Sequence, residues 1–252
     1  MIIEDTGNHG EYIRYHRNLK IYRATRKNFE IKGVGRGGIL LTSGSKLTLV
    51  FGAHPDDLEI GMAGTITKLS GMGYLVQPIV ATLPNFVETD RKEERKAEAI
   101  RSTKVMGCLV PEFLDLSPDE IIFGRKFVTL IDSIVKKYSP EAVFTQWSGD
   151  SHQDHQALTK AVIAACRDQN DLFMYESTIP GGITDNAFRP QLFVDITHTI
   201  DAKKNSLECF DSQLIRCGEL WIPAIIGRCS YRGYQMNVKY AEAFEVVKVT
   251  KW

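Results

Sequence analysis

Two short segments of this 252-residue chain carry residue types that together could bind a metal ion. The first, His54–Asp57 (HPDD), lies in the stretch 47–61, where an apolar run typical of a strand gives way to an apolar helical pattern. The second, His152–His155 (HQDH), follows about a hundred residues later. Imidazole and carboxylate groups suit Zn²⁺. Each segment is therefore a candidate half of a metal site, which the rest of the chain would bring together.

The spacing within each segment indicates which residues could bind the metal and which could face a water molecule or the substrate. His54 and Asp57 are three residues apart, which in the first turn of a helix places both within reach of one ion. Asp56 lies between them, is rotated away by about 100° in a helix, and could touch a metal-bound water instead. His152 and His155 are also three apart, so one can bind the metal while the other faces the substrate.

These residues would suffice for hydrolysis of an amide. A catalytic zinc typically has three protein ligands and an open position for water, and it lowers the pKa of that water to about 7. His54, Asp57 and one histidine of the second segment supply the three ligands. Asp56 would act as general base, and the remaining histidine, protonated, would stabilise the oxyanion or assist the leaving amine.

Each segment alone has a simpler explanation. Adjacent aspartates such as Asp56 and Asp57 favour the first turn of a helix, where they cap it. Histidines spaced like His152 and His155 also occur at solvated helix starts. Neither explanation accounts for two such segments at the rim of one sheet, so we favour the metal site.

The elements around the two segments alternate between strand and helix, which predicts an α/β fold: a mostly parallel sheet with helices on both faces. In such sheets ligands bind beyond the carboxyl ends of the strands. His54 follows the first expected strand and His152 the fourth, so we expect them to meet. The expected strands cover 47–51, 75–82, 112–116, 141–145, 172–176 and 191–196; the helices cover 58–72, 89–106, 118–138, 152–167 and 199–210; residues 217–233 are rich in turn signals and 238–247 form a final segment.

Length and composition exclude several classes of protein. A chain of this length is expected to form one large domain, here 46–252, with 1–45 as an extension. The formal net charge of zero argues against general affinity for nucleic acid or anionic membranes. The start of the chain lacks the pattern of a secretion signal, and no apolar run is long enough to span a bilayer. Five scattered cysteines without a CxxC pair indicate free thiols and a cytoplasmic protein.

Residues 1–45 differ in character from the rest, being polar, aromatic and basic. Such a segment could contact a polyanion, but with no net positive charge we favour a flap or a contact in a homo-oligomer. Residues Gly33–Gly38 match GxGxxG, yet a strand-like run follows instead of the helix that a dinucleotide loop requires. We therefore interpret this match as a turn.

The chain resembles the PIG-L/LmbE-like family of zinc-dependent deacetylases. The resemblance rests on AHPDD (53–57) with Glu59 and Gly61, and on HQDH (152–155). Weaker matches run from about 47 to 244 and leave 1–45 outside. They comprise Arg95–Glu98 (RKAE), Phe193–Ile196 (FVDI) followed by Lys203 and Ser212-Gln213, and Tyr240–Phe244 (YAEAF).

The resemblance implies a Rossmann-like fold and removal of an N-acetyl group, usually from a small amino sugar of the N-acetylglucosamine type. By motif position it implies zinc ligands at His54, Asp57 and His155, a general base at Asp56, and an oxyanion-stabilising histidine at His152. It also implies that Arg95 binds sugar hydroxyls. A solvated charge on a highly charged helix is the alternative for Arg95.

The chain departs from the family pattern at two places. Thr82-Leu83-Pro84-Asn85 replaces a Thr-Asp-Gly-like turn that shapes the substrate pocket, so the usual sugar is not assumed, and Phe210 stands where histidine or tyrosine is common. The metal could be Zn²⁺, Fe²⁺ or Co²⁺. An amidase acting on a larger conjugate and a non-catalytic metal- or sugar-binding module stay open as alternatives, and a nucleotide-binding oxidoreductase is the weakest of them.

Overall fold

The structure is a computed structural model that describes residues 46–83, 91–169 and 171–250, together with the backbone of three short strands near the N-terminus. These are β1 (Ile2–Glu4), β2 (Glu11–Arg14) and β3 (Arg23–Ala24), which pair antiparallel in that order. The rest of the expected extension 1–45, including the Gly33–Gly38 turn, lies outside the described residues. So do positions 84 and 85 of the loop that differs from the family pattern.

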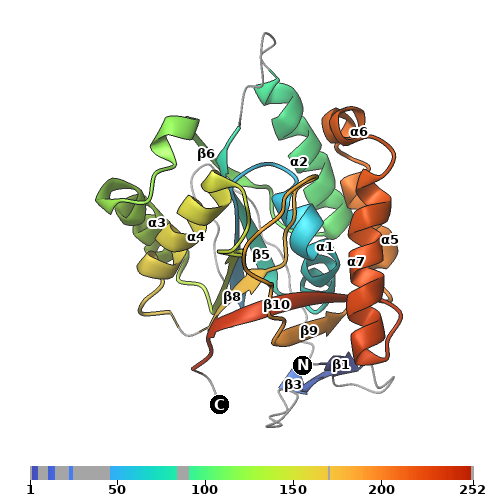
Figure 1. Cartoon of the computed structure of the whole chain (residues 1–252). Coiled ribbons are helices and arrows are strands. Elements are labelled where there is room, and N and C mark those ends of the chain that lie inside the picture. The colour runs from blue at the N-terminus through green and yellow to red at the C-terminus, as the bar shows by residue number, and fades with distance from the viewer. Residues whose placement is uncertain are drawn as a thin grey trace.

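A seven-stranded sheet forms the centre of the molecule (Figure 1), with the strand order β6-β5-β4-β7-β8-β10-β9. The first five of these strands are parallel, and β10 runs antiparallel to both of its neighbours. In chain order the parallel strands read 3-2-1-4-5, so the fold is a Rossmann-like α/β fold as predicted. The strands are β4 (Leu47–Gly52), β5 (Leu75–Thr82), β6 (Glu112–Leu116), β7 (Ala142–Gln146), β8 (Asp171–Tyr175), β9 (Leu192–Asp195) and β10 (Ala241–Lys248).

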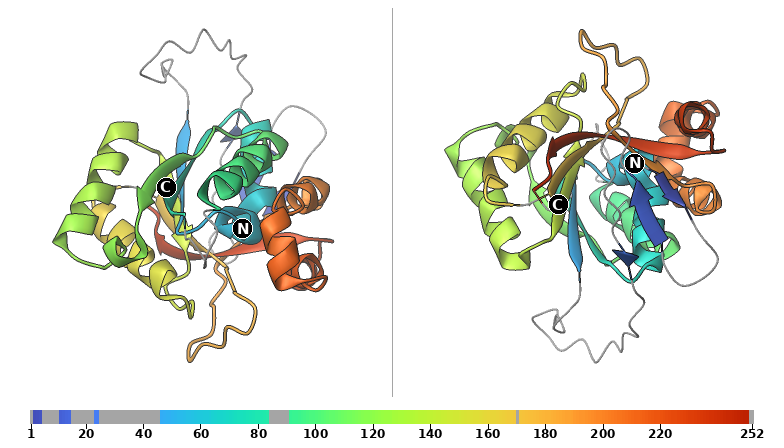
Figure 2. Two further views of the ribbon diagram at one scale, coloured as in Figure 1. Left: turned by 90° about the horizontal axis from the view of Figure 1, so that it is seen from above. Right: turned by 90° about the horizontal axis from the view of Figure 1, so that it is seen from below.

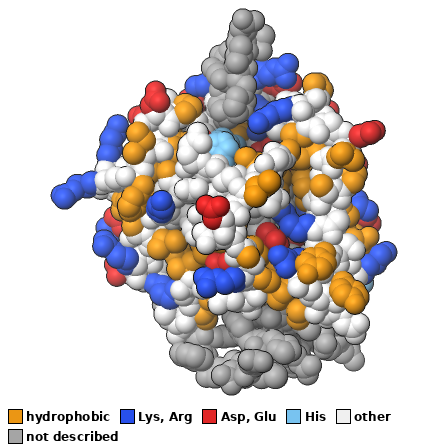
Figure 3. Space-filling view, viewed as in Figure 1, with side chains coloured by type: hydrophobic (Ala, Val, Ile, Leu, Met, Phe, Trp, Pro, Cys, Tyr) orange, Lys and Arg blue, Asp and Glu red, His pale blue; other side chains and the backbone are white. Residues whose placement is uncertain are grey.

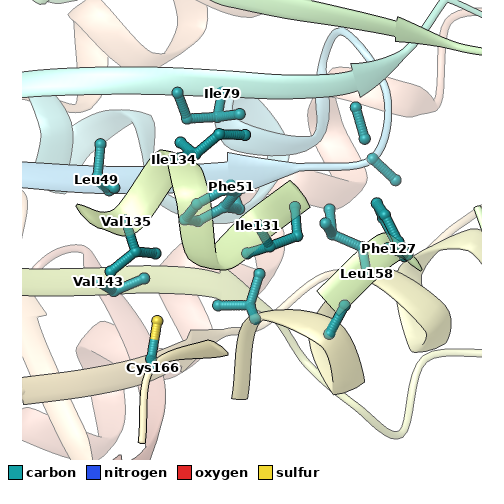
Figure 4. Packing of buried hydrophobic residues seen from close by; sticks show 14 of the residues in the cluster. Leu49, Phe51, Ile79, Phe127, Ile131, Ile134, Val135, Val143, Leu158 and Cys166 are labelled. Carbon is teal, nitrogen blue, oxygen red and sulfur yellow. The ribbon is translucent and has the colours of Figure 1, made fainter. Parts of the chain in front are cut away.

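Helices cover both faces of the sheet (Figure 2). On one face α3 (Arg125–Tyr138) and α4 (Gln153–Ala165) pack against Leu49 and Phe51 of β4, in the apolar cluster drawn in Figure 4. On the other face α1 (Asp57–Gly71), α2 (Lys92–Met106), α5 (Ile200–Leu207) and α7 (Trp221–Met236) contribute to a cluster around Val50. Because successive strand side chains point to opposite faces, the continuous apolar run of β4 supplies both clusters.

One predicted element is wrong at its start, and another is wrong throughout. The helix expected over 118–138 starts too early: Pro118–Glu120 is a single 3-10 turn closed by a Ser117–Glu120 capping box, whereas α3 begins at Arg125, after an extended Gly124, and ends at Tyr138 as expected. The supposed turn-rich stretch 217–233 contains the end of α6 (Asp211–Cys217) and most of α7.

The reason for the second error lies in α7 itself. Pro223 falls in the first turn, where its missing N–H costs nothing, and the glycines inside the helix suggested turns. Trp221, Ile225, Cys229 and Gly233 recur every four residues and form the buried face of the helix. Tertiary packing of this face outweighs the low helix propensity of glycine.

Two expectations from composition can be compared with the structure. All five cysteines are unpaired, as predicted. None of the helices within the described ranges has the length and apolar character needed to cross a membrane.

Candidate metal centre

The strand order places the two motifs at one point. The chain leaves β4 through α1 toward one side of the sheet and leaves β7 through α4 toward the other, so β4 and β7 flank the switch point where ligands bind in such folds. His54 lies just beyond β4, and His155 lies in the first turn of α4. Nδ1 of His54 is 3.2 Å from Nε2 of His155, so the two motifs meet as expected.

The three predicted ligands form a compact triangle. Nε2 of His155 is 3.3 Å from Oδ1 of Asp57, and Nδ1 of His54 is 3.6 Å from Oδ2 of the same carboxylate. Ligand atoms placed tetrahedrally about 2.0–2.1 Å from a zinc ion are about 3.3–3.4 Å from one another. The sides of the triangle therefore match one face of a zinc tetrahedron, and all three residues are buried.

The opposite ring nitrogens of both histidines contact carboxylates. Nε2 of His54 lies 3.0 Å from Oδ2 of Asp154, and Nδ1 of His155 lies 3.0 Å from Oδ2 of Asp150. Because a carboxylate only accepts hydrogen bonds, each of these nitrogens carries a proton. In the neutral rings, Nδ1 of His54 and Nε2 of His155 then point lone pairs at each other and at Asp57. Such an arrangement is typical of a metal site with outer carboxylates that orient the ligands.

The charges around this point also favour a cation. Asp56, Asp57, Asp150 and Asp154 are all at least nine-tenths buried, and the buried guanidinium of Arg95 lies beside Asp56. Burial lowers the pKa of His155, but the carboxylates of Asp57 and Asp150 outweigh it and raise that pKa to about 10. The site thus attracts positive charge, and a divalent cation would offset much of the buried negative charge.

Asp56 is held in an unusual conformation. Its backbone is left-handed, with φ 102° and ψ −22°, which separates its carboxylate from that of Asp57 directly before α1 begins. We expected a helical rotation to do this, but both Asp56 and His54 precede the helix. Arg95 donates to the carbonyl of Pro55 and lies 3.4 Å from Oδ1 of Asp56. Burial raises the pKa of Asp56 to about 6, and Arg95 opposes the rise, so this carboxylate is ionised at neutral pH and can accept a proton.

His152 differs from our expectation in its protonation. It caps α4, and its Nδ1 accepts the backbone N–H of Asp154 at 3.2 Å, which leaves Nε2 as the donor of a neutral ring. Burial and the neighbouring rings of His54 and His155 lower the pKa of His152, where we expected a protonated imidazole. Its side chain is 25 % exposed, more than the other two histidines. On the face shown in Figure 3, histidine reaches the surface beside apolar side chains.

Arg95 is only 5 % exposed, which excludes the solvated charge that we considered. Besides the Pro55 carbonyl, it contacts the hydroxyl of Ser212, 3.0 Å from Nη1, and Ser212 in turn donates to Glu98 at 2.6 Å. Arg95 nevertheless lines the cavity at the centre. Its contacts favour a role in holding the Asp56 turn, and contact with a sugar stays a prediction.

Sequence reasoning assigned no role to Asp150 or Asp154, although both contact the rings of the predicted ligands. Asp154 lies inside the quoted HQDH motif, and Asp150 is two residues before it, which was the available signal. Asp150 also accepts from the hydroxyl of Ser177 at 2.7 Å. The cavity above the triangle has an apolar wall as well as this polar floor, formed by Ile60, Ile179, Pro180, Cys217 and Trp221.

Comparison with known proteins agrees with this geometry. Residues 49–166 match the PIG-L family model, described as GlcNAc-PI de-N-acetylase. An uncharacterized deacetylase, YaiS, of Escherichia coli is 29 % identical over 165 residues, covering 62 % of this chain and 86 % of the relative. Diacetylchitobiose deacetylase of Thermococcus kodakarensis is 26 % identical over 222 residues, covering 80 % of this chain and 83 % of the relative.

Solved structures share the fold. N,N'-diacetylchitobiose deacetylase of Pyrococcus horikoshii superposes with a TM-score of 0.68 at 21 % identity, covering 81 % of this chain and 84 % of the other. GalB of Pseudomonas putida, a 4-carboxy-2-hydroxymuconate hydratase, superposes with a TM-score of 0.67 at 20 % identity over 82 % and 99 % of the two chains. Because these two proteins catalyse different reactions, the fold alone does not identify the chemistry. Residues 49–166 thus carry a PIG-L family domain, in which the two motifs matched in sequence are joined in space.

Proposed function

We propose that this protein is a metal-dependent hydrolase that removes an N-acetyl group from an amino sugar or an amino-sugar conjugate. The observation that carries the proposal is the triangle of His54, Asp57 and His155, whose two ring nitrogens and carboxylate oxygens lie close enough together to hold one ion at a buried position. The names of the family model and of the archaeal relative support the substrate class.

His54, Asp57 and His155 would hold the ion, and Zn²⁺ fits two nitrogens and one oxygen at these separations. Fe²⁺ and Co²⁺ accept similar ligands and are the alternatives. When bound, such an ion acts as a Lewis acid toward the acetyl carbonyl and acidifies a water molecule.

The remaining steps belong to side chains. Asp56, ionised at neutral pH, takes a proton from the attacking water as its oxygen bonds to the acetyl carbon. His152, through Nε2–H, donates to the carbonyl oxygen as negative charge develops there. The C–N bond then breaks, the proton held by Asp56 passes to the amine, and acetate is released. Arg95 keeps the Asp56 turn in place, and the part of its side chain that lines the cavity would bind a sugar hydroxyl.

The test is acetate release from N-acetylglucosamine, N,N'-diacetylchitobiose and a larger N-acetylglucosamine conjugate, with and without chelation and added zinc. We expect activity that is lost on chelation, restored by zinc, and abolished in Asp56→Asn. Release of a larger acid in place of acetate would indicate the conjugate amidase. Zinc binding without turnover of any acylated substrate would indicate a binding module. A cytoplasmic location and a homo-oligomer stay predictions, and the unpaired cysteines agree with the first.

A further inference from the structure

The helix that follows the first motif is broken one turn after it begins. Met62, inside α1, has φ −151° and ψ 24°, far from helical values. In an unbroken helix the N–H of Gly64 would bond the carbonyl of Ile60, four residues earlier. Here that N–H donates instead to Oε1 of Glu242, at 3.1 Å, and the N–H of Thr65 donates to Oε2 at 2.7 Å.

The carbonyls on the other side of the break bond to cations. Nζ of Lys203 donates to the carbonyls of Glu59 and Ile60 at 2.9 and 3.0 Å, and to Oε1 of Glu242 at 2.7 Å. Nη2 of Arg228 donates to the Ile60 carbonyl at 2.6 Å. The Lys203–Glu242 ion pair is thus inserted into the hydrogen-bond ladder of α1, between Ile60 and Gly64.

The charges are arranged as the two helix segments require. The ammonium group lies at the carboxyl end of the first turn, and the carboxylate lies at the amino end of the second segment, so each complements the local helix dipole. Lys203 is fully buried and Glu242 is 3 % exposed. Because a buried ion pair often adds no more stability than apolar residues of the same volume, stability alone does not account for it.

A close contact fixes the same turn from another side. A Cβ on Gly61 would lie 2.1 Å from the ring of Tyr175, so only glycine fits beside that ring. The Tyr175 hydroxyl donates to the carbonyl of Phe51, near the end of β4, at 2.9 Å. The first turn of α1 is therefore tied to the strand that leads into the HPDD motif.

We infer that Lys203 and Glu242 are positioning residues: they hold the first turn of α1 at the angle that directs Asp57 toward His54 and His155. If α1 were straight, its first turn would share the axis of the longer segment that follows Met62, and Asp57 would point in a different direction. The inference rests on the proposed function, because it takes Asp57 as a metal ligand. It also gives a role to two matched positions, 203 and 242, that lie outside the cavity.

The experiment measures the dissociation constant for zinc by competition with a chromophoric chelator, well below the melting temperature of each protein. The main variant is Lys203→Met combined with Glu242→Gln, which leaves no buried charge unpaired. Arg228→Met removes a donor to the same carbonyl from a half-buried position and keeps the test available if the double variant does not fold. Ile134→Ala, in α3 on the other face of the sheet from α1, is the destabilised control.

We expect zinc binding by the double variant to weaken about 10- to 100-fold, the range seen when supporting residues behind metal ligands are removed. Arg228→Met should weaken binding in the same direction but less, and Ile134→Ala should bind zinc as the unmodified protein does despite its lower melting temperature. Unchanged affinity in the double variant, or in Arg228→Met if the double variant does not fold, would overturn the inference while leaving the proposed function intact. Failure of the unmodified protein to bind zinc or another divalent cation would overturn both.

Discussion

Replacing Asp150 with asparagine changes one atom in the layer behind the proposed ligands. Its Oδ2 accepts from Nδ1–H of His155 at 3.0 Å and from the Ser177 hydroxyl at 2.7 Å, and its Oδ1 accepts the backbone N–H of His152 at 3.0 Å. All three partners are donors. An amide NH₂ group in place of either oxygen therefore faces a donor and cannot satisfy it.

The asparagine has two orientations, and both disturb the site. With NH₂ toward the backbone, the N–H of His152 loses its acceptor and meets a second donor. With NH₂ toward His155, that ring must accept on Nδ1 and carry its proton on Nε2, the atom that faces His54 and Asp57. The proton then occupies the position of the ion. Loss of an outer carboxylate typically costs about 10- to 100-fold in metal affinity, or about 1.4–2.8 kcal/mol.

The assay is again zinc competition at a temperature where the variant is fully folded. Asp201→Asn, the same substitution at a side chain that is 88 % exposed, is the matched control and should bind zinc as the unmodified protein does. Undiminished zinc affinity in Asp150→Asn would show that Asp150 does not set the tautomer of His155. It would also refute the argument that the outer carboxylates fix which ring nitrogens of His54 and His155 are free to bind the ion.

Three further predictions follow from the same contacts. Asp56→Asn should retain zinc but lose about 10²- to 10⁴-fold in kcat/KM for acetate release, because the general base is gone; comparable activity would remove Asp56 from that role. With the pKa of Asp56 at about 6, kcat/KM should fall as the pH drops below about 6 and the base becomes protonated, and a flat profile between pH 7 and 5 would contradict this. Gly61→Ala should lower the free energy of unfolding, measured in urea, by about 1–3 kcal/mol, because the new Cβ would clash with the ring of Tyr175. Gly71→Ala is the control and should not destabilise the protein, because its Cβ would have no atom within 4 Å.

The sheet and the meeting of the motifs could be predicted because both depend on strong local signals. The buried parallel strands read as apolar runs, and the switch point follows from their order. Helix α7 could not be predicted with the same rules, because Pro223 and Gly227 suggest turns while its helical state depends on packing of Trp221 and Ile225 against other elements. Asp150 is one of 31 acidic residues, and the sequence does not say which of them contacts a histidine ring.

The protonation of the candidate site could not be predicted from the sequence. The left-handed backbone of Asp56 is supported by Arg95 of α2, whose guanidinium donates to the carbonyl of Pro55, forty residues earlier in the chain. The neutral state of His152 depends on an N–H at the start of α4 and on two neighbouring rings. These contacts exist only in the folded chain, so residue types and spacing point to candidate groups but not to their proton positions.

The residues that support the candidate centre extend well beyond the segment that carries the proposed ligands. The family match ends at residue 166, yet Ser177 bonds the carboxylate behind His155, and Ser212 holds Arg95. Lys203 and Glu242, from α5 and β10, complete the broken ladder of α1. Through these contacts the last third of the chain packs directly against the start of α1, which follows the first motif. A ligand set assembled from two loops needs such support, since ligand groups displaced by even 1 Å would no longer form the face of a tetrahedron.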